Sequence, residues 1–192
     1  LRNRSQATVI AAIRDCQLRL PYPLLGLDSD NGAEFINHEL KRLCEQEHIT
    51  FTRCRPYKKN DQAYVEQKNW TAVRQMVGYD RYEGEPAWLA LQALYHVLRL
   101  YLNFFQPVMV LVEKQRVGAK VIKRYDVPKT PYQRILEAPE IDPAVKERLR
   151  QLYESLNPAE LQRQIHRRQA VLWRLACPPA VPGGTQVPPT PP

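Results

Sequence analysis

The chain has 192 residues, and its 28 lysines and arginines against 20 aspartates and glutamates give a net charge of +8. Hydrophobic residues make up 44% and charged residues 25%, which excludes a wholly disordered or collagen-like chain. The longest apolar stretch, residues 89–105, is interrupted by polar side chains such as Arg99, so we expect no membrane-spanning segment and no membrane partner. No export signal opens the printed sequence, which favours a cytoplasmic setting.

Helix and strand patterns alternate from the start of the chain. The spacing of Val9, Ile10 and Ile13 predicts a helix over residues 5–20, which ends before two prolines. Residues 24–27 form a short apolar run that predicts a strand buried on both faces, followed by the polar turn Asp28-Ser29-Asp30-Asn31-Gly32. Polar side chains are therefore expected at the carboxyl end of a strand, where open α/β sheets bind their ligands.

A second strand and two more helices continue this alternation. Asn37 is expected to cap a helix whose inner face includes Leu40, and residues 49–52 alternate as a strand. Residues 53–61 are polar and basic, which predicts a loop, and residues 63–78 have the apolar spacing of a helix. An order of helix, strand, helix, strand and helix is typical of an α/β layered fold.

The rest of the chain is expected to be mostly helical. Residues 85–105 have apolar side chains every three or four positions, which predicts a long helix. Asp142 and Asn157, each followed by proline, mark the starts of two further helices, which we interpret as a helical hairpin over residues 141–176. Seven of the 17 prolines fall in residues 177–192, which predicts a disordered tail.

The positive charge is concentrated in the second half of the chain. Residues 1–110 contain 14 basic and 12 acidic side chains, whereas residues 111–176 contain 14 and 8. Residues 111–140 are therefore interpreted as a basic linker that suits phosphate contacts on DNA. Its cations are Lys114, Arg116, Lys120, Lys123, Arg124, Lys129 and Arg134.

Two carboxylates have the positions that metal-dependent chemistry requires. Asp30 follows the first predicted strand, and Glu66 lies in the first turn of a helix, with thirty-five residues between them. If the two elements meet at the carboxyl edge of a sheet, both side chains can share Mg²⁺ or Mn²⁺, because these ions prefer hard oxygen ligands. The structural alternative is that Asp30 is a turn residue and Glu66 a favourable first-turn charge.

Several motifs together resemble one enzyme superfamily. They are Asp30-Asn31-Gly32-Ala33-Glu34-Phe35, Arg55-Pro56-Tyr57 and Val65-Glu66-Gln67-Lys68-Asn69, in this order and at this spacing. Over roughly residues 5–135 the chain resembles the catalytic core of the DDE integrase and transposase superfamily, particularly bacterial insertion-sequence transposases with a retroviral-integrase-like core.

The resemblance implies a fold, an activity and roles for the acids. It implies an RNase H-like fold that binds two Mg²⁺ (or Mn²⁺) ions, nicks the ends of a mobile element and joins a 3′-hydroxyl to target DNA. Asp30 matches the second catalytic aspartate of the family, and Glu66 matches its catalytic glutamate. Asp28 is a weaker candidate for the role of Asp30.

The chain departs from the family pattern in two ways. Many relatives have glycine three residues before the catalytic glutamate, where this chain has Ala63. The first catalytic aspartate of the family lies on an earlier strand, and only Asp15 and Asp28 precede Asp30 here. We therefore expect an N-terminally truncated core that lacks about three strands and is inactive in strand transfer.

The expected organisation follows from these elements. The fold class is α/β, with a partial RNase H-like integrase core over residues 1–110, the basic linker over 111–140 and the helical hairpin over 141–176. The tail, residues 177–192, completes the chain.

DNA is the expected partner, both as mobile-element ends and as target. The residues expected to contact it lie in the loop before Glu66, on the helix that contains Glu66, and in the basic linker, although a solvated charged face is the alternative. They are Arg55, Lys58, Lys59, Lys68, Asn69, Arg74, Lys120, Lys123 and Arg124. A homo-oligomer is also expected, held by the helical hairpin unless the hairpin's apolar stripe packs on its own core.

Two other functions are consistent with the same residues. A non-enzymatic DNA-binding or assembly remnant of a transposase would keep the basic linker and the helical hairpin without catalysis. A nuclease built on the same sheet would cut DNA without joining ends, so its products would distinguish it.

Overall fold

The computed structural model describes residues 5–29, 38–55 and 63–177. The predicted features at Asp30, Asn37, Lys58 and Lys59 lie outside these residues, as does nearly all of the proline-rich tail. The predictions that concern them therefore stay predictions.

The N-terminal part is a small α/β unit. Helix α1 (Gln6–Arg19) and strand β1 (Gly26–Ser29) are followed by helix α2 (His38–Gln46) and strand β2 (Thr50–Arg53). The two strands pair in parallel, as a strand–helix–strand unit requires. The predicted alternation of helix and strand is confirmed here. The core of this unit contains Leu40, Leu43, Cys44 and Ile49, with Ile10, Ile13, Leu24, Leu27 and Phe51 packed against it.

Strand β1 is less buried than its sequence suggests. The prediction of a strand buried on both faces is wrong, because Gly26 and Asp28 are exposed and the preceding Leu25 is 76% exposed. The physical reason is that the described sheet has only two strands, β1 and β2, so β1 has one neighbour and little cover.

The helix predicted over residues 63–78 is present, but its middle is not α-helical. It consists of α3 (Ala63–Lys68), the π-helical segment η2 (Asn69–Arg74) and α4 (Gln75–Val77). Within it, the Thr71 hydroxyl donates to the carbonyl of Gln67 at 3.0 Å, a local bond that competes with regular helix bonding. The helix ends at Gly78, whose φ of 82° lies in a region that favours glycine.

The larger core lies between two long helices. Helix α5 (Gly84–Phe104), which the sequence predicts over residues 85–105, packs against α8 (Pro158–Trp173). Their buried residues join one cluster, and Leu94 and Leu172 are both 0% exposed. Gln169 of α8 also donates to the carbonyl of Met76 in α4 at 2.8 Å. Helix α8 is therefore part of the main core.

The predicted helical hairpin is corrected by this packing. Helices α7 (Pro143–Ser155) and α8 both form, with Asp142 and Asn157 as N-cap residues, as expected. However, the main partners of α8 are α5 and α4, and α7 contacts α6 (Pro131–Glu137). The apolar stripe of α8 faces α5 because Leu161, Ile165 and Leu172 complete the core around α5. The alternative noted from the sequence, that this stripe packs on its own core, is the one observed.

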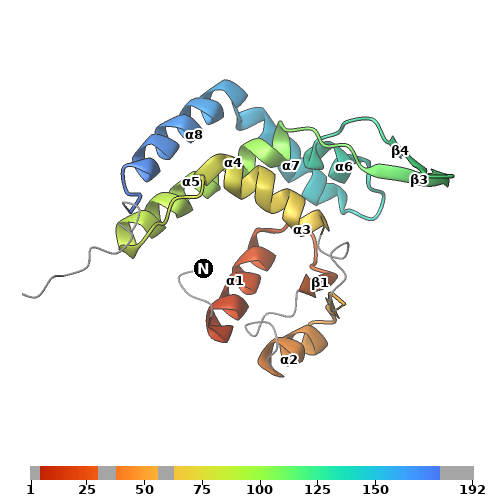
Figure 1. Cartoon of the computed structure of the whole chain (residues 1–192). Helices are drawn as coiled ribbons and strands as arrows, with labels where there is room; N and C mark the ends of the chain where they lie inside the picture. The colour runs from red at the N-terminus through yellow and green to blue at the C-terminus, as the bar shows by residue number, and fades with distance from the viewer. Residues whose placement is uncertain (1–4, 30–37, 56–62, 178–192) are drawn as a thin grey trace, which may run out of the picture.

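The segment interpreted as a basic linker is folded. Strands β3 (Leu111–Val117) and β4 (Lys120–Tyr125) form an antiparallel hairpin, and α6 follows it. The turn contains Gly118 with a φ of 60°, a conformation that glycine adopts at low cost. The β3–β4 hairpin extends away from the helices, whereas α1, β1 and α2 gather on the other side of α3 (Figure 1). No helix among the described residues has the length and apolar character needed to cross a membrane.

Candidate functional site

One acid at the carboxyl end of the parallel strands is held by its neighbours. Asp28 lies near the end of β1, and its Oδ1 accepts a hydrogen bond from the Thr52 hydroxyl on β2 at 2.7 Å. Its Oδ2 lies 3.7 Å from the Sγ of Cys54, which follows β2. The parallel register aligns Asp28 with Thr52, so the two side chains meet across the sheet. The candidate Asp30 comes two residues later, outside the described residues.

Glu66 is exposed on α3, the helix that follows the loop after β2. No hydrogen bond or ion pair joins its carboxylate to another residue in the described part of the chain. Within that part, no protein donor competes with a cation for its two oxygens. Sequence reasoning expects Glu66 in the first turn of the helix, and the structure places it there.

Carboxylate oxygens, such as those of Asp28 and Glu66, are the type of ligand that a hard divalent cation prefers. Mg²⁺ takes one or two protein carboxylates and completes its shell with water or phosphate oxygens. Glu66 supplies such a carboxylate, while the oxygens of Asp28 already accept from Thr52 and Cys54. Within residues 5–29, 38–55 and 63–177, no three His, Cys, Asp or Glu side chains form a group that could hold a metal ion.

Polar and basic side chains follow Glu66 along the same helix. Lys68, Asn69 and Arg74 are all exposed, and the Arg74 guanidinium lies 4.8 Å from the centroid of the Tyr79 ring. That contact is within the range of a cation–π interaction and holds Arg74 near the end of the helix. A π turn contains about one residue more than an α turn, so positions counted at the α-helical period do not continue through η2. The expectation that Arg74 shares a face with Glu66 therefore stays a prediction.

The basic loop before Glu66 is described only at its start. Arg55 is exposed and directly follows the buried Cys54 at the end of the sheet. Lys58 and Lys59 lie outside the described residues. Arg55 is thus the one predicted DNA contact of this loop that the structure locates, two residues beyond the carboxyl end of β2.

The seven cations of the basic segment fall into two groups. Three of them are in ion pairs: Arg124 with Glu113 at 3.1 Å, Lys129 with Glu137 at 2.6 Å and Arg134 with Asp126 at 2.7 Å. The other four, Lys114, Arg116, Lys120 and Lys123, are exposed on the β3–β4 hairpin and have no carboxylate partner among the described residues. From the sequence, Lys120, Lys123 and Arg124 were the predicted DNA contacts of this segment; the pairing of Arg124 with Glu113 was not foreseen, because an ion pair between distant residues leaves no local signal.

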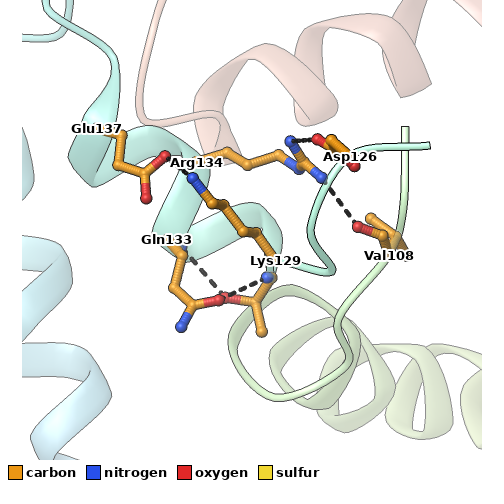
Figure 2. Close-up of polar contacts among 7 residues, drawn as sticks. Val108, Asp126, Lys129, Gln133, Arg134 and Glu137 are labelled. Carbon is orange, nitrogen blue, oxygen red and sulfur yellow. Dashed lines mark hydrogen bonds and ion pairs between the residues drawn. The ribbon is translucent and has the colours of Figure 1, made fainter. Parts of the chain in front are cut away.

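A network of polar contacts connects the base of the hairpin to α6, and sequence reasoning missed it. Arg134 donates from Nη1 to Asp126 and from Nη2 to the carbonyl of Val108, at 2.7 and 2.9 Å, as Figure 2 shows. Asp126 also accepts from the Val110 N–H at 2.6 Å. The hydrogen bond from Arg134, together with that from Val110, lowers the pKa of the Asp126 carboxyl below its ordinary value.

The start of α6 belongs to the same region. Thr130 and Gln133 form a capping box, in which the Thr130 hydroxyl accepts from the Gln133 N–H and the Gln133 amide oxygen accepts from the Thr130 N–H. The sequence Thr130-Pro131-Tyr132-Gln133 contains this signal, because Thr and Gln stand three residues apart ahead of an apolar run. Helix α6 was therefore detectable from the sequence, unlike the ion pair to Asp126.

Comparison with known proteins finds one related sequence of undetermined role. No family model matches the chain. It is 47% identical over 134 residues to "Uncharacterized protein y4rM" of Sinorhizobium fredii (strain NBRC 101917 / NGR234). The aligned residues make up 70% of this chain but 38% of the relative, so the chain spans well under half the length of that protein.

Proposed function

We propose that this chain is part of an integrase-type transposase that carries out DNA strand transfer by metal-dependent phosphoryl transfer. The observation that carries the proposal is the parallel β1–β2 pair, which has Asp28 near its carboxyl end, followed by a helix with the exposed carboxylate of Glu66. Open α/β sheets bind their ligands at this edge. The motifs around Asp30 and Glu66 and their spacing support the same function.

The chemistry assigned to the residues is limited to binding and positioning. Asp30 and Glu66 would hold the divalent cation, and Asp28 connects the ends of the two strands through its hydrogen bond from Thr52. When bound, Mg²⁺ or Mn²⁺ supplies the positive charge that stabilises the attacking and leaving oxygens of an in-line displacement. The RNase H-like core, with further strands beside β1, is part of the proposal. The residues that position the DNA strand near these carboxylates are Arg55, Lys68, Asn69 and Arg74.

A second candidate function has its own support. The basic hairpin and the α5–α8 core contain neither Asp30 nor Glu66, so a non-enzymatic DNA-binding or assembly module would keep both. In that case the chain would bind DNA with no requirement for a divalent cation. A homo-oligomer, which would hold two DNA ends, stays a prediction under either function.

Manganese binding tests the proposed site directly. We expect Asp30→Asn and Glu66→Gln each to weaken Mn²⁺ binding by about tenfold or more, since each removes a charged oxygen ligand. Electron paramagnetic resonance of free Mn²⁺ in titrations of the 192-residue protein measures this. Glu154→Gln is the matched control, because Glu154 is exposed on α7 and its loss changes the net charge equally. Binding that is unchanged in both site variants would reject the metal site and favour the non-enzymatic module.

A further inference from the structure

We propose that one face of the β3–β4 hairpin binds the phosphate backbone of duplex DNA. The inference deepens the proposed function, on which it rests for the choice of DNA as partner, and it assigns a contact surface outside the carboxylate site. It concerns the face that contains Lys114, Arg116 and Lys123, which we call the basic face.

The strand register separates the two faces of the hairpin. Residues directly opposite in an antiparallel pair point to the same side, and alternate residues point to opposite sides. The pairs Lys114↔Lys123 and Arg116↔Val121 therefore share the basic face. The pair Glu113↔Arg124 lies on the other face and forms an ion pair. The basic face thus has three cations and, among the paired residues, no acid.

Lys114 and Lys123 form an unfavourable pair in the isolated hairpin. They stand directly opposite each other, and like charges in such cross-strand pairs are destabilising. All residues from 112 to 125 are exposed, so the two ammonium groups are not buried against acidic residues of the rest of the protein. A phosphate group between the two ammonium groups would convert this repulsion into attraction. An anion is therefore the complementary ligand.

The base of the hairpin is anchored, which fixes the direction of the basic face. Arg134 donates hydrogen bonds to Asp126 and to the carbonyl of Val108 (Figure 2). Backbone hydrogen bonds also connect Val108 and Lys129 in both directions. A two-stranded hairpin is only marginally stable by itself in water, so these hydrogen bonds at its base help to keep the two strands paired. The hairpin extends beyond the helices, where a long polyanion can reach it without contacting α5 or α8 (Figure 1).

Duplex DNA fits this face better than other polyanions. The major groove of B-DNA admits a two-stranded ribbon, whereas that of an RNA duplex is deep and narrow. An anionic membrane would be bound by a continuous apolar face beside the cations. The exposed apolar residues of the hairpin are instead divided, with Val121 and Tyr125 on the basic face, Val117 and Ile122 on the other, and Val112 at the irregularity in the strand pairing.

Binding of a labelled duplex tests the assignment. Fluorescence anisotropy with a duplex of arbitrary sequence, about 30 base pairs long, gives the Kd in KCl from about 50 to 200 mM without divalent cation. For Lys114→Gln/Arg116→Gln/Lys123→Gln we expect Kd to rise by about 100-fold or more near 0.1 M salt. The slope of log affinity against log salt should become shallower by about 2.7, which is about 0.9 for each of three lost phosphate contacts.

Two further variants distinguish direct phosphate contact by the hairpin from an effect of net charge or of disturbed folding. Arg81→Gln/Arg148→Gln/Arg150→Gln removes the same charge from exposed positions outside the hairpin, and its affinity should stay within a few-fold of the unmodified protein. Lys114→Arg/Lys123→Arg keeps the cations and should retain tight binding. Equal losses in both triple variants would show a general charge effect and overturn the proposal, as would unchanged binding in the hairpin variant.

Separate outcomes distinguish this inference from the proposed catalytic site. The two measurements are independent, because the duplex titration contains no divalent cation and the Mn²⁺ titration contains no DNA. Two results together would support both proposals: Mn²⁺ binding that is weakened in Asp30→Asn and Glu66→Gln, and duplex binding that is weakened in the hairpin triple variant. Binding to vesicles of anionic phospholipid, with none to the duplex, would overturn the DNA assignment while leaving the carboxylate site to its own test.

Discussion

Asp126 illustrates how a single side chain can organise a segment that has few buried residues. It accepts from Arg134 and from the Val110 N–H, so one carboxylate connects the start of β3, the end of β4 and helix α6. The hydrogen bond from Arg134 lowers the pKa of Asp126, and the same bond raises the pKa of Arg134. Ionised Asp126 therefore stabilises the folded state relative to the unfolded chain.

Asp126→Asn should remove a stabilisation that depends on pH. Because the folded pKa of Asp126 is below the unfolded value of about 3.9, the stabilisation is complete above that value and is lost as the pH falls through the folded pKa. We expect the variant to melt below the unmodified protein near neutral pH, and the difference to shrink in strong acid. Thermal unfolding followed by circular dichroism at several pH values measures this. Glu140→Gln, at an exposed position, is the control for the loss of one acid, and a pH-independent difference for Asp126→Asn would contradict the assignment.

At the scale of helices and strands, local sequence signals predicted where most helices lie but not which helices pack against each other. Asp142 and Asn157 both cap helices where their sequence context predicts them. The pairing of α5 with α8 depends on residues far apart in the chain, such as Leu94 and Ile165, and no local pattern specifies it. The β3–β4 hairpin was missed for a related reason. Its strands are exposed on both faces, so they lack the regular apolar alternation that identifies a half-buried strand.

Leu172→Ala tests whether α8 belongs to the main core. Leu172 is 0% exposed and packs in the cluster that includes Leu94 and Leu98, so we expect a loss of about 2–5 kcal/mol in the free energy of unfolding. Urea unfolding of the purified protein gives this value. Val171→Ala is the matched control on the neighbouring residue, because Val171 is 53% exposed, and its effect should be within about 0.5 kcal/mol. Equal effects of the two substitutions would show that α8 does not pack as described.

Taken as a whole, the described residues form two hydrophobic clusters and two separate two-stranded sheets. One cluster lies around α2 and the β1–β2 pair, and the other lies between α5 and α8. A two-stranded parallel sheet leaves backbone groups unpaired along its edges, and Leu25 is exposed beside β1. The proposed RNase H-like core implies, by its resemblance, further strands that would cover this edge and supply the third acid.

The 192-residue protein by itself should not join DNA strands. We expect no joined product when it is incubated with labelled oligonucleotide ends, target plasmid and Mg²⁺ or Mn²⁺, because a pair of bound ions normally needs a third bridging carboxylate. Sequencing gels resolve nicked from joined products. Glu66→Gln is the control, since a product that persists in this variant does not come from the proposed site. Joined product that depends on Glu66 would show that the third acid is supplied from within these residues.

Local sequence patterns were enough to predict the positions of the helices, because helix formation depends on residues within a few turns of one another. Apolar periodicity and capping residues placed α1, α5, α7 and α8, and the motif spacing placed Glu66 at the start of a helix. Only tertiary packing determined which helix faces meet, which cations of the basic segment are paired, and that this segment is a hairpin anchored by Asp126 and Arg134. The physical reason is that helix bonds close over about four residues, whereas burial, strand pairing and ion pairs depend on groups far apart in the chain.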